Sequence, residues 1–588
     1  MFLRATRRKK NGKVHRYWSV VESRRLASGR PVQKTLLYLG ELNDSQHAGW
    51  CRTIEASVGN VETQLALFPS DRTPPPGLPS VQIRMEELTL HKPRQWGACW
   101  LAMVLWNQLK LDEFWGPLLP PSREGTSWLH VLKTLTAYRL IDPGSEWRLH
   151  RLWFDRSAMA DLLDEDFGVV AKDTLYRCLD KLVEHKAALF DHLKERWADL
   201  FSARFEVLLY DLTSTYFECD APQVGSGGLR RHGYSRDKRP DCVQVVIALI
   251  VTPDGFPLAY EVMKGNTADN TTLSQFLKTI EQQYGKAGRV WIMDRGIPTE
   301  ETLAQMRASE TPMHYLVGTP KGRLTQLEQS FLGQDWQRAK ENVQVKLHAA
   351  GDELYVLALS AERVQKERGM RRRKLERLWK RLHELKRMKQ TREELLMRLG
   401  AARKEAGRTW SLVDIETRGE FTFRLNTTKL RQARSREGRY LLRTNLTARD
   451  PAQLWRLYIQ LTEIEQVFKE IKQDLGLRPI HHQTDERIQA HIFVAFLSYC
   501  LLVTLKARLR RHAGGLTPRS VLEQLKAIQM LDVKAPTTDG RDLTLTRYTQ
   551  PDTAQQLILA QLGLTLPPQP PPRITTPPSR TEADVVKT

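Results

Sequence analysis

The chain has 588 residues, more than a single hydrophobic core usually holds, which predicts several domains. Hydrophobic residues make up 41% of it, and this share excludes a wholly disordered protein. Ninety Lys and Arg residues against 68 Asp and Glu residues give a formal net charge of +22. Such an excess favours a polyphosphate, and above all nucleic acid, as the partner.

The cysteines and the apolar segments bear on the cellular compartment. Six cysteines are scattered without a Cys-x-x-Cys pair, which is typical of a reducing cytosol and speaks against a zinc ribbon or a disulfide framework. The basic N-terminus is not followed by an apolar stretch, so we expect no signal peptide. The longest apolar run, 492–505, is shorter than the roughly 20 residues of a membrane span and predicts a buried core helix. We therefore expect a cytoplasmic protein and no membrane partner.

The first 72 residues predict a small, basic, β-rich module. Residues 14–23 and 32–40 have strand patterns, and a Ser-Gly-Arg-Pro turn at 28–31 joins them into a hairpin. Four consecutive cations precede the hairpin and are candidate DNA contacts: Arg7, Arg8, Lys9 and Lys10. A Pro-rich stretch at 73–80 predicts a linker.

Residues 81–204 have the apolar spacing of helices and form a candidate DNA-binding domain. Two of its segments, 126–140 and 172–186, fit either a helix-turn-helix or ordinary packed helices, because the helix-turn-helix has no strong sequence code. From 205 to 320 strand patterns come first in succession and then alternate with helices, which predicts a mixed α/β sheet.

Residues 361–408 are almost all strong helix formers. Leu375, Leu378, Leu382 and Leu385 recur at spacings of three and four, which favours a coiled-coil-like packed arm over a solvated charged helix. After a second stretch at 439–510, the C-terminal region 511–588 becomes Pro-rich from about residue 565, which predicts a disordered tail.

Two aspartates stand at strands of the predicted sheet. Asp211 lies inside the apolar strand 207–212, where a carboxylate is costly unless it is paired. Asp294 ends the strand 290–294, and ligands of open α/β sheets gather at the carboxyl ends of strands. Each alone fits a capped or salt-bridged strand end, but two on neighbouring strands of a basic protein favour a metal site.

A third carboxylate lies on a well-marked helix. Asp450 and Pro451 predict its start, and Gly476 its end. Tyr458, Glu465 and Lys472 are spaced by seven residues and form one row beside the apolar stripe. The row offers a carboxylate for metal, an ammonium for phosphate and a phenol for hydrogen bonding; a surface helix with incidental polar residues is the alternative.

These residue types suit phosphodiester chemistry. Three carboxylates, Asp211, Asp294 and Glu465, can hold two Mg²⁺ ions, for which Mn²⁺ can substitute, because Mg²⁺ keeps waters and takes substrate oxygens as further ligands. Such chemistry needs no His or Cys nucleophile, and no convincing pattern for one is present.

The segment YIQLTEIEQVFKEIK (458–472), with Asp211 in YDLTSTYFE and Asp294 in WIMDRGI, resembles the DDE transposases of bacterial insertion sequences. The resemblance is to the insertion-sequence-four superfamily, whose signature is Tyr-x2-Arg-x3-Glu-x6-Lys. It extends to HGYSRDKRPDCVQV (232–245) and GNTADN (265–270) and covers about 205–320, 440–505 and the N-terminal hairpin.

Leu461 occupies the Arg position of that signature, so the phosphate contact of the Arg is either lost or supplied elsewhere, with Arg456 and Lys469 as candidates. The resemblance implies that Tyr458 and Lys472 hold DNA phosphates near a flipped terminal base. Trp336 or Trp410 could catch that base, although an ordinary core role is the simpler reading of either.

The resemblance further implies a ribonuclease H-like fold in two parts, 205–320 and 439–510, around an insertion domain at 321–438. It implies cut-and-paste transposition by nicking, hairpin formation and strand transfer at element ends. The expected partners are double-stranded DNA, with terminal inverted repeats and target sites, and a second copy of the chain. The expected place is the bacterial cytoplasm, at the nucleoid when DNA is bound.

Further polar residues have weaker signals. Arg236, Lys238 and Arg239 lie in a predicted loop and are candidate phosphate contacts. His481 and His482 fit a polar loop better than a metal or DNA site.

Glu218 and Asp220 follow the first strand, but their less apolar surroundings make them poorer metal ligands than Asp211. Two other functions stay open: a ribonuclease H-like nuclease without strand transfer, and a domesticated DNA-binding protein without catalysis.

Overall fold

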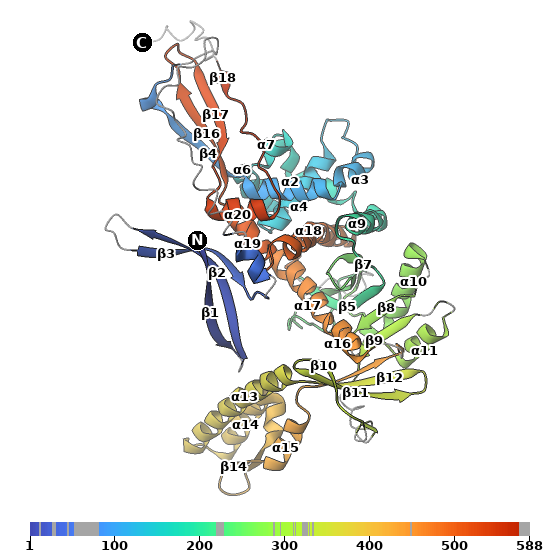
Figure 1. Ribbon diagram of the computed structural model, residues 1–588. Coiled ribbons are helices and arrows are strands. Elements are labelled where there is room, and N and C mark those ends of the chain that lie inside the picture. Colours follow the sequence, from blue (N-terminus) through green and yellow to red (C-terminus); the bar gives the residue numbers. More distant parts are fainter. Residues whose placement is uncertain are drawn as a thin grey trace.

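The computed structural model describes residues 1–10, 13–25, 31–43, 46–51, 54, 82–218, 228–285, 288–294, 296–309, 311, 313–319, 327, 330–331, 334–446 and 450–575. Figure 1 shows a large central sheet flanked by helices, a separate sheet formed by the N-terminal strands, a further sheet near the C-terminus and a projecting helical arm. The predicted linker at 73–80 lies outside the described residues.

The central sheet has nine strands in the order β10-β11-β12-β15-β9-β8-β5-β6-β7. In that order their bounds are β10 (Gln337–Lys340), β11 (Val343–Ala350), β12 (Glu353–Ser360), β15 (Arg439–Thr444), β9 (His314–Gly318), β8 (Val290–Met293), β5 (Val207–Tyr216), β6 (Gln244–Val251) and β7 (Pro257–Lys264). β5 pairs in parallel with β8 and β8 with β9, whereas the other pairs are antiparallel. The predicted mixed α/β sheet is therefore confirmed.

Both faces of this sheet are covered. β6 reads QVVIALIV and is buried at every position, as expected for a strand between two covered faces. On one face pack α10 (Leu273–Tyr284), whose start is preceded by η6 (Asp269–Thr271), and α11 (Glu300–Ala308). The other face meets the helical domain and the helix that carries Glu465.

The helical domain is built around α18 (Asp485–His512). The other helices are α2 (Gly97–Gln108), α3 (Leu111–Leu118), α4 (Trp128–Ile141), α5 (Glu146–Arg148), η3 (Leu149–Trp153), α6 (Phe154–Arg156), α7 (Met159–Leu163), η4 (Phe167–Val170), α8 (Lys172–Leu179), η5 (Val183–His185), α9 (Lys186–Phe201), α19 (Pro518–Leu525) and α20 (Thr553–Gln561). By length and composition α18 could cross a membrane, but 94% of its most apolar window is buried inside the protein. This burial confirms the predicted core helix at 492–505.

The two segments that fitted a helix-turn-helix contain α4 and α8. Twelve of the 14 residues of α4 are buried, and α4 packs against α18, α2 and α8. The two helices of a helix-turn-helix are joined by a turn of three or four residues. Here α5, η3, α6, α7 and η4 lie between α4 and α8, so the two helices do not form this motif. The alternative of ordinary helical packing is therefore what the structure shows.

Two smaller sheets lie outside the centre. The N-terminal sheet has three strands rather than a hairpin, β1 (Phe2–Lys10), β2 (Lys13–Arg25) and β3 (Pro31–Gly40), because the basic segment itself pairs with β2. The second sheet joins β4 (Thr89–Gln95), preceded by η2 (Met85–Glu87), to β16 (Gln529–Pro536), β17 (Asp542–Tyr548) and β18 (Arg573–Thr575).

β4 and β18 correct two expectations. The stretch 81–204 is not helical throughout, since β4 pairs with β16. The predicted disorder from about 565 does not hold for β18, which pairs with β17, while residues 576–588 lie outside the described part.

The helical arm, residues 361–438, leaves the central sheet at the end of β12 and returns at β15, and it lies within the predicted insertion at 321–438. It consists of α13 (Ala361–Arg387), α14 (Arg392–Ala406), η7 (Gly407–Leu412), β13 (Val413–Glu416), β14 (Thr422–Leu425) and α15 (Thr427–Ser435). Leu378, Leu382 and Leu385 of the predicted seam are buried against α14. A Thr391–Glu394 capping box fixes the start of α14, so α13 and α14 form a hairpin with its own small core.

The predicted helix from Asp450 to Gly476 is interrupted. It consists of α16 (Pro451–Ile459), α17 (Leu461–Lys469) and one turn of π-helix, η8 (Glu470–Asp474). Gln460 separates α16 from α17, and Lys472 lies inside the π-turn, whose extra residue changes the helical spacing, so the row of Tyr458, Glu465 and Lys472 is not continuous.

Candidate active site

Strand register places the two aspartates side by side. β5 and β8 run in parallel with Tyr210 opposite Met293, and Asp211 and Asp294 are the residues that directly follow this pair in the chain. Asp211 is half-buried, and Asp294, just beyond β8, is exposed. α17 packs against β5 and carries the exposed Glu465. Three carboxylates from separate segments thus lie together at the carboxyl end of β8. This group of Asp211, Asp294 and Glu465 is called the carboxylate edge.

The pKa of Asp211 depends on the charges of the groups that surround it. Its pKa is raised to about 7, chiefly by burial. A hydrogen bond donated by the Leu212 N–H to Oδ1, at 2.8 Å, opposes this rise, whereas the negative charge of Asp294 and then that of Glu465 add to it. An arrangement of repelling carboxylate oxygens is the donor set that hard divalent cations prefer.

Arg236 is a basic residue whose charge acts on the carboxylate of Asp211. Its positive charge lowers the pKa of Asp211, and its backbone N–H donates to Ser214 Oγ on β5 at 3.3 Å. Its guanidinium forms an ion pair with Asp269, which precedes α10. Sequence reasoning proposed Arg236 as a phosphate contact, and the structure places it beside the carboxylate edge.

Lys472 lies in the π-turn and is buried rather than exposed. Its Nζ donates to Asp237 at 3.1 Å, and Arg478 Nη1 lies 2.6 Å from the same carboxylate. Burial lowers the pKa of Lys472, while the charge of Asp237 and its hydrogen bond oppose that shift. Asp237 and Arg478 were missed as partners because they lie in other segments of the chain, and no local pattern marks such a pair.

The remaining predicted DNA contacts are spread over several elements. Lys238 follows Asp237 with a positive φ of 60°, and Arg239 pairs with Glu218 and Asp241 while covering the ring of Tyr216. Tyr458 is half-buried against Tyr440 and Trp455.

Arg7 is exposed on β1, and the backbones of Arg8, Lys9 and Lys10 pair with β2 opposite His15, Val14 and Lys13. Asp220 lies outside the described residues.

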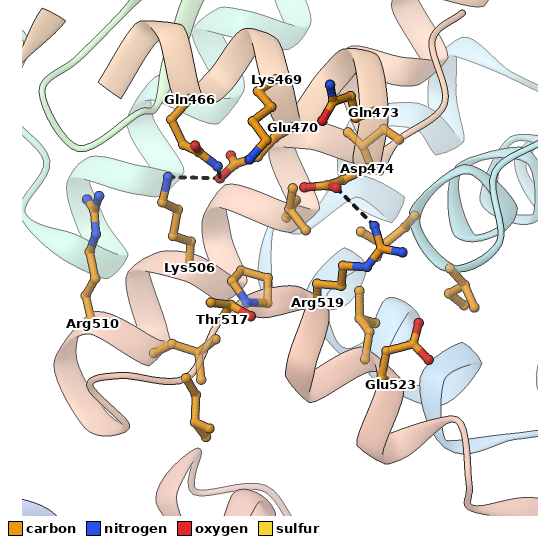
Figure 2. A pocket seen from close by; sticks show the side chains of 18 of the residues that line it. Gln466, Lys469, Glu470, Gln473, Asp474, Lys506, Arg510, Thr517, Arg519 and Glu523 are labelled. Carbon is orange, nitrogen blue, oxygen red and sulfur yellow. Dashed lines mark hydrogen bonds and ion pairs between the residues drawn. The ribbon is translucent and has the colours of Figure 1, made fainter. Parts of the chain in front are cut away.

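The substitutes considered for Leu461 do not reach the carboxylate edge by any contact that the structure describes. Arg456 is exposed and donates to Ala452 O at 3.2 Å on its own helix. Lys469 lines a separate cavity of about 670 Å³ between α17, α18 and α19 (Figure 2), which none of the three carboxylates lines. Among the described cations, Arg236 acts on the charge of Asp211, and Lys472 and Arg478 pair with Asp237, the next residue after Arg236.

The two tryptophans proposed for a flipped base have other surroundings. Trp410 packs in the small core of the arm, against the seam of α13 and α14. Trp336 lies under Lys346, whose Nζ is 5.1 Å from the ring centroid. The core role expected as the simpler reading therefore applies to Trp410.

A second, fully buried polar cluster surrounds Glu146. Its Oε1 lies 3.4 Å from His482 Nε2, 3.5 Å from His491 Nδ1 and 3.6 Å from Arg139 Nη2. Although burial alone raises its pKa, hydrogen bonds to the two histidines and the charge of Arg139 hold the pKa of Glu146 well below its usual range. Burial lowers the pKa of His491 to about 4, and the charge of Arg139 adds to that shift.

This cluster supports the segment after the π-turn. Arg139 Nη1 donates to Gly476 O at 3.0 Å, and His491 Nε2 lies 3.3 Å from Leu477 O. Among the described residues, this is the group whose acidic and imidazole atoms all lie within 4.8 Å of one another. The guanidinium in its midst repels a metal ion, so we interpret it as an ion-pair network; His482 is core rather than a polar loop.

Two segments of the chain match known protein families. Residues 219–501 match the transposase DDE domain, a range that includes Asp294 and Glu465 and begins eight residues after Asp211. Residues 3–64 match the N-terminal domain of IS1634 family transposases. The chain carries a DDE transposase domain. It follows an IS1634-family N-terminal domain, and DDE transposases generally use divalent metal ions.

No curated protein sequence matches the chain. Among solved structures, a cryo-EM structure of piggyBac transposase in a synaptic complex with hairpin DNA aligns with 72% of this chain and 79% of its own. The sequence identity is 8% and the TM-score 0.36.

Proposed function

We propose that this DDE transposase catalyses cut-and-paste transposition of an insertion sequence in the bacterial cytoplasm. Cleavage and strand transfer take place at the inverted repeats of the element, through a hairpin on the flanking DNA and within a dimer. The observation that carries the proposal is the register of β5 and β8, which brings Asp211 next to Asp294. The helix α17 packs against β5 and adds Glu465 to this pair. A ribonuclease H-like catalytic domain accounts for this arrangement.

Each group has a role in the proposed reaction. Asp211, Asp294 and Glu465 would hold two Mg²⁺ ions, which would activate the attacking hydroxyl and neutralise charge at the leaving oxygen. Arg236, beside Asp211, attracts the scissile phosphate, and Lys472 with Arg478 attracts the next one. Tyr458, Lys238 and Arg239 add polar contacts to the DNA. The basic residues Arg7, Arg8, Lys9 and Lys10 of β1 contact phosphates of the element end.

A donor plasmid that carries the element with both ends tests the function. With Mg²⁺ or Mn²⁺ we expect nicked ends, hairpins on the flanks and joined products at new sites, and with EDTA none of them. Denaturing gels resolve the nicks and hairpins, and sequencing of junctions detects insertion. Cleavage without joined products indicates the nuclease alternative, and binding without cleavage indicates the domesticated one.

The ion pairs of Asp237 with Lys472 and Arg478 predict that two substitutions change the DNA affinity in opposite directions. A DNA phosphate and the Asp237 carboxylate compete for the same two cations. We therefore expect Asp237→Asn to raise the affinity for an end-bearing duplex several-fold and Lys472→Ala to lower it several-fold, as measured by fluorescence anisotropy at constant salt.

Tyr458→Phe is the mild comparison, since loss of one hydroxyl costs about 0.5–1.5 kcal/mol when it makes one hydrogen bond. Affinity shifts of the same sign for Asp237→Asn and Lys472→Ala contradict the competition.

A further inference from the structure

The helical arm concentrates the positive charge of the protein. Residues 361–438 contain 24 Lys and Arg against 11 Asp and Glu, a net +13 out of +22 for the whole chain. Many of these cations are neutralised locally by ion pairs, among them Arg372 with Glu376 and Arg381 with Glu384. The others decide what the surface of the arm can bind.

One row of cations follows the outward side of α13. Lys366, Arg373, Arg377, Lys380 and Arg387 are spaced by seven, four, three and seven residues and are all exposed. At 100° per residue, this row lies on the side of the helix opposite the leucine seam that packs against α14. At about 1.5 Å per residue, it is roughly 31 Å long. Within the described part of the chain, no ion pair involves Lys366, Arg377, Lys380 or Arg387.

A cavity of about 320 Å³ opens beside this row, between α13 and α14. Lys374, Arg377 and Arg381 line it, with Glu405 as the single carboxylate. Arg381 pairs with Glu384, so Lys374 and Arg377 against Glu405 leave an excess of positive charge, which favours an anionic occupant such as a phosphate.

The base of the arm is fixed to the catalytic sheet. Buried Glu437 pairs with Arg368 at 2.9 Å and with Arg371, and Gly438 N donates to Glu367 Oε2 at 3.0 Å. Gly438 has a φ of 68°, and a Cβ there would lie 2.4 Å from Val364, so the crossing of α13 and β15 is close. Since β15 pairs with β9 and β9 with β8, the arm is attached to the same sheet as β8, the strand that Asp294 follows.

From these observations we propose that the outward face of α13 binds the sugar–phosphate backbone of duplex DNA next to the cleavage site. The inference rests on the proposed function only for the place of that DNA. A row of about 31 Å matches roughly nine base pairs at about 3.4 Å each. The centres of protein interfaces are depleted of charged residues as a class and enriched in aromatic ones, so a row of five cations without an aromatic residue fits DNA better than a second protein. The row binds without reading sequence, because phosphates carry no sequence information.

The test compares two triple variants of the full chain that remove the same charge. The arm variant is Lys366→Gln, Arg377→Gln and Lys380→Gln. The control variant is Arg123→Gln, Arg156→Gln and Lys181→Gln, three exposed cations of the helical domain. Binding is measured in Ca²⁺ over a salt titration, with an end-bearing duplex and an unrelated duplex.

For the arm variant, the slope of log affinity against log salt is expected to fall by up to about 2.7, at roughly 0.9 per phosphate contact, equally for both duplexes. The control variant is expected to keep a slope close to that of the unchanged protein. Equal slopes for the two variants overturn the inference. So does a change in the sedimentation of the DNA-free arm variant with unchanged DNA binding, which identifies the row as a contact between copies.

Failure of this inference is distinguishable from failure of the proposed function. The salt titration needs no cleavage, so it gives its result even if the protein never nicks DNA. Conversely, an arm variant that binds like the unchanged protein leaves metal-dependent cleavage by the carboxylates untouched.

Discussion

Asp211→Asn, Asp294→Asn and Glu465→Gln are each expected to reduce nicking by several orders of magnitude while DNA binding is retained. An amide is nearly the same size as the carboxylate but lacks the negative charge that holds a divalent cation. Because the three side chains come from β5, the end of β8 and α17, none can replace another. The measurement is the yield of nicked ends and hairpins across a Mn²⁺ titration.

Asp241→Asn is the matched control, since Asp241 is an exposed carboxylate paired with Arg239 in the neighbouring loop. We expect it to nick DNA at nearly the normal rate. Full cleavage by any of the three amide variants, or an equal loss in Asp241→Asn, contradicts the assignment of the site.

The raised pKa of Asp211 gives a readout independent of activity. An acid whose pKa rises to about 7 in the folded protein resists ionisation there, whereas it ionises near 4 in the unfolded chain. Without metal, the folded protein is therefore destabilised progressively as the pH rises from about 4 to about 7. Asp211→Asn removes this cost, so we expect it to melt at a higher temperature than the unchanged protein at pH 8 in EDTA, with the difference vanishing near pH 4.

Glu146→Ala is expected to cause the largest loss of stability outside the site. Arg139, Glu146 and both histidines are buried, so removal of the carboxylate leaves the Arg139 guanidinium uncompensated inside the protein. Breaking a buried ion pair in this way costs about 3–5 kcal/mol. Thermal unfolding followed by circular dichroism measures the loss, and DNA cleavage is also expected to fall because Arg139 and His491 support Gly476 and Leu477 after the π-turn.

The control is Glu165→Ala, which breaks an ion pair of Glu165 with His130 in the same domain. About a quarter of each of these side chains is exposed, so we expect a cost of about 1 kcal/mol or less. An equal effect of the two substitutions shows that the buried network is no more important than a surface pair.

Several features of this protein were determined by local sequence. The apolar runs around Asp211 and Asp294 predict strands with a carboxylate in or after them, and the leucine spacing in 361–408 predicts a packed helical arm, which the structure contains. The charge of +22 predicts nucleic acid. These signals are readable because strand and helix periods, and net charge, depend on neighbours along the chain.

Only the tertiary structure decided which distant groups meet. Asp237 and Lys472, 235 residues apart, pair because the loop before β6 packs against the π-turn. The π-turn itself buries Glu470 and Lys472 and breaks a row that looked continuous in sequence. Leucine stands at position 461 in place of a signature cation, and Arg236, whose charge acts on Asp211, comes from another segment of the chain. Ion pairs and register between remote segments depend on the packing of whole elements, and hydrophobic periodicity carries no information about them.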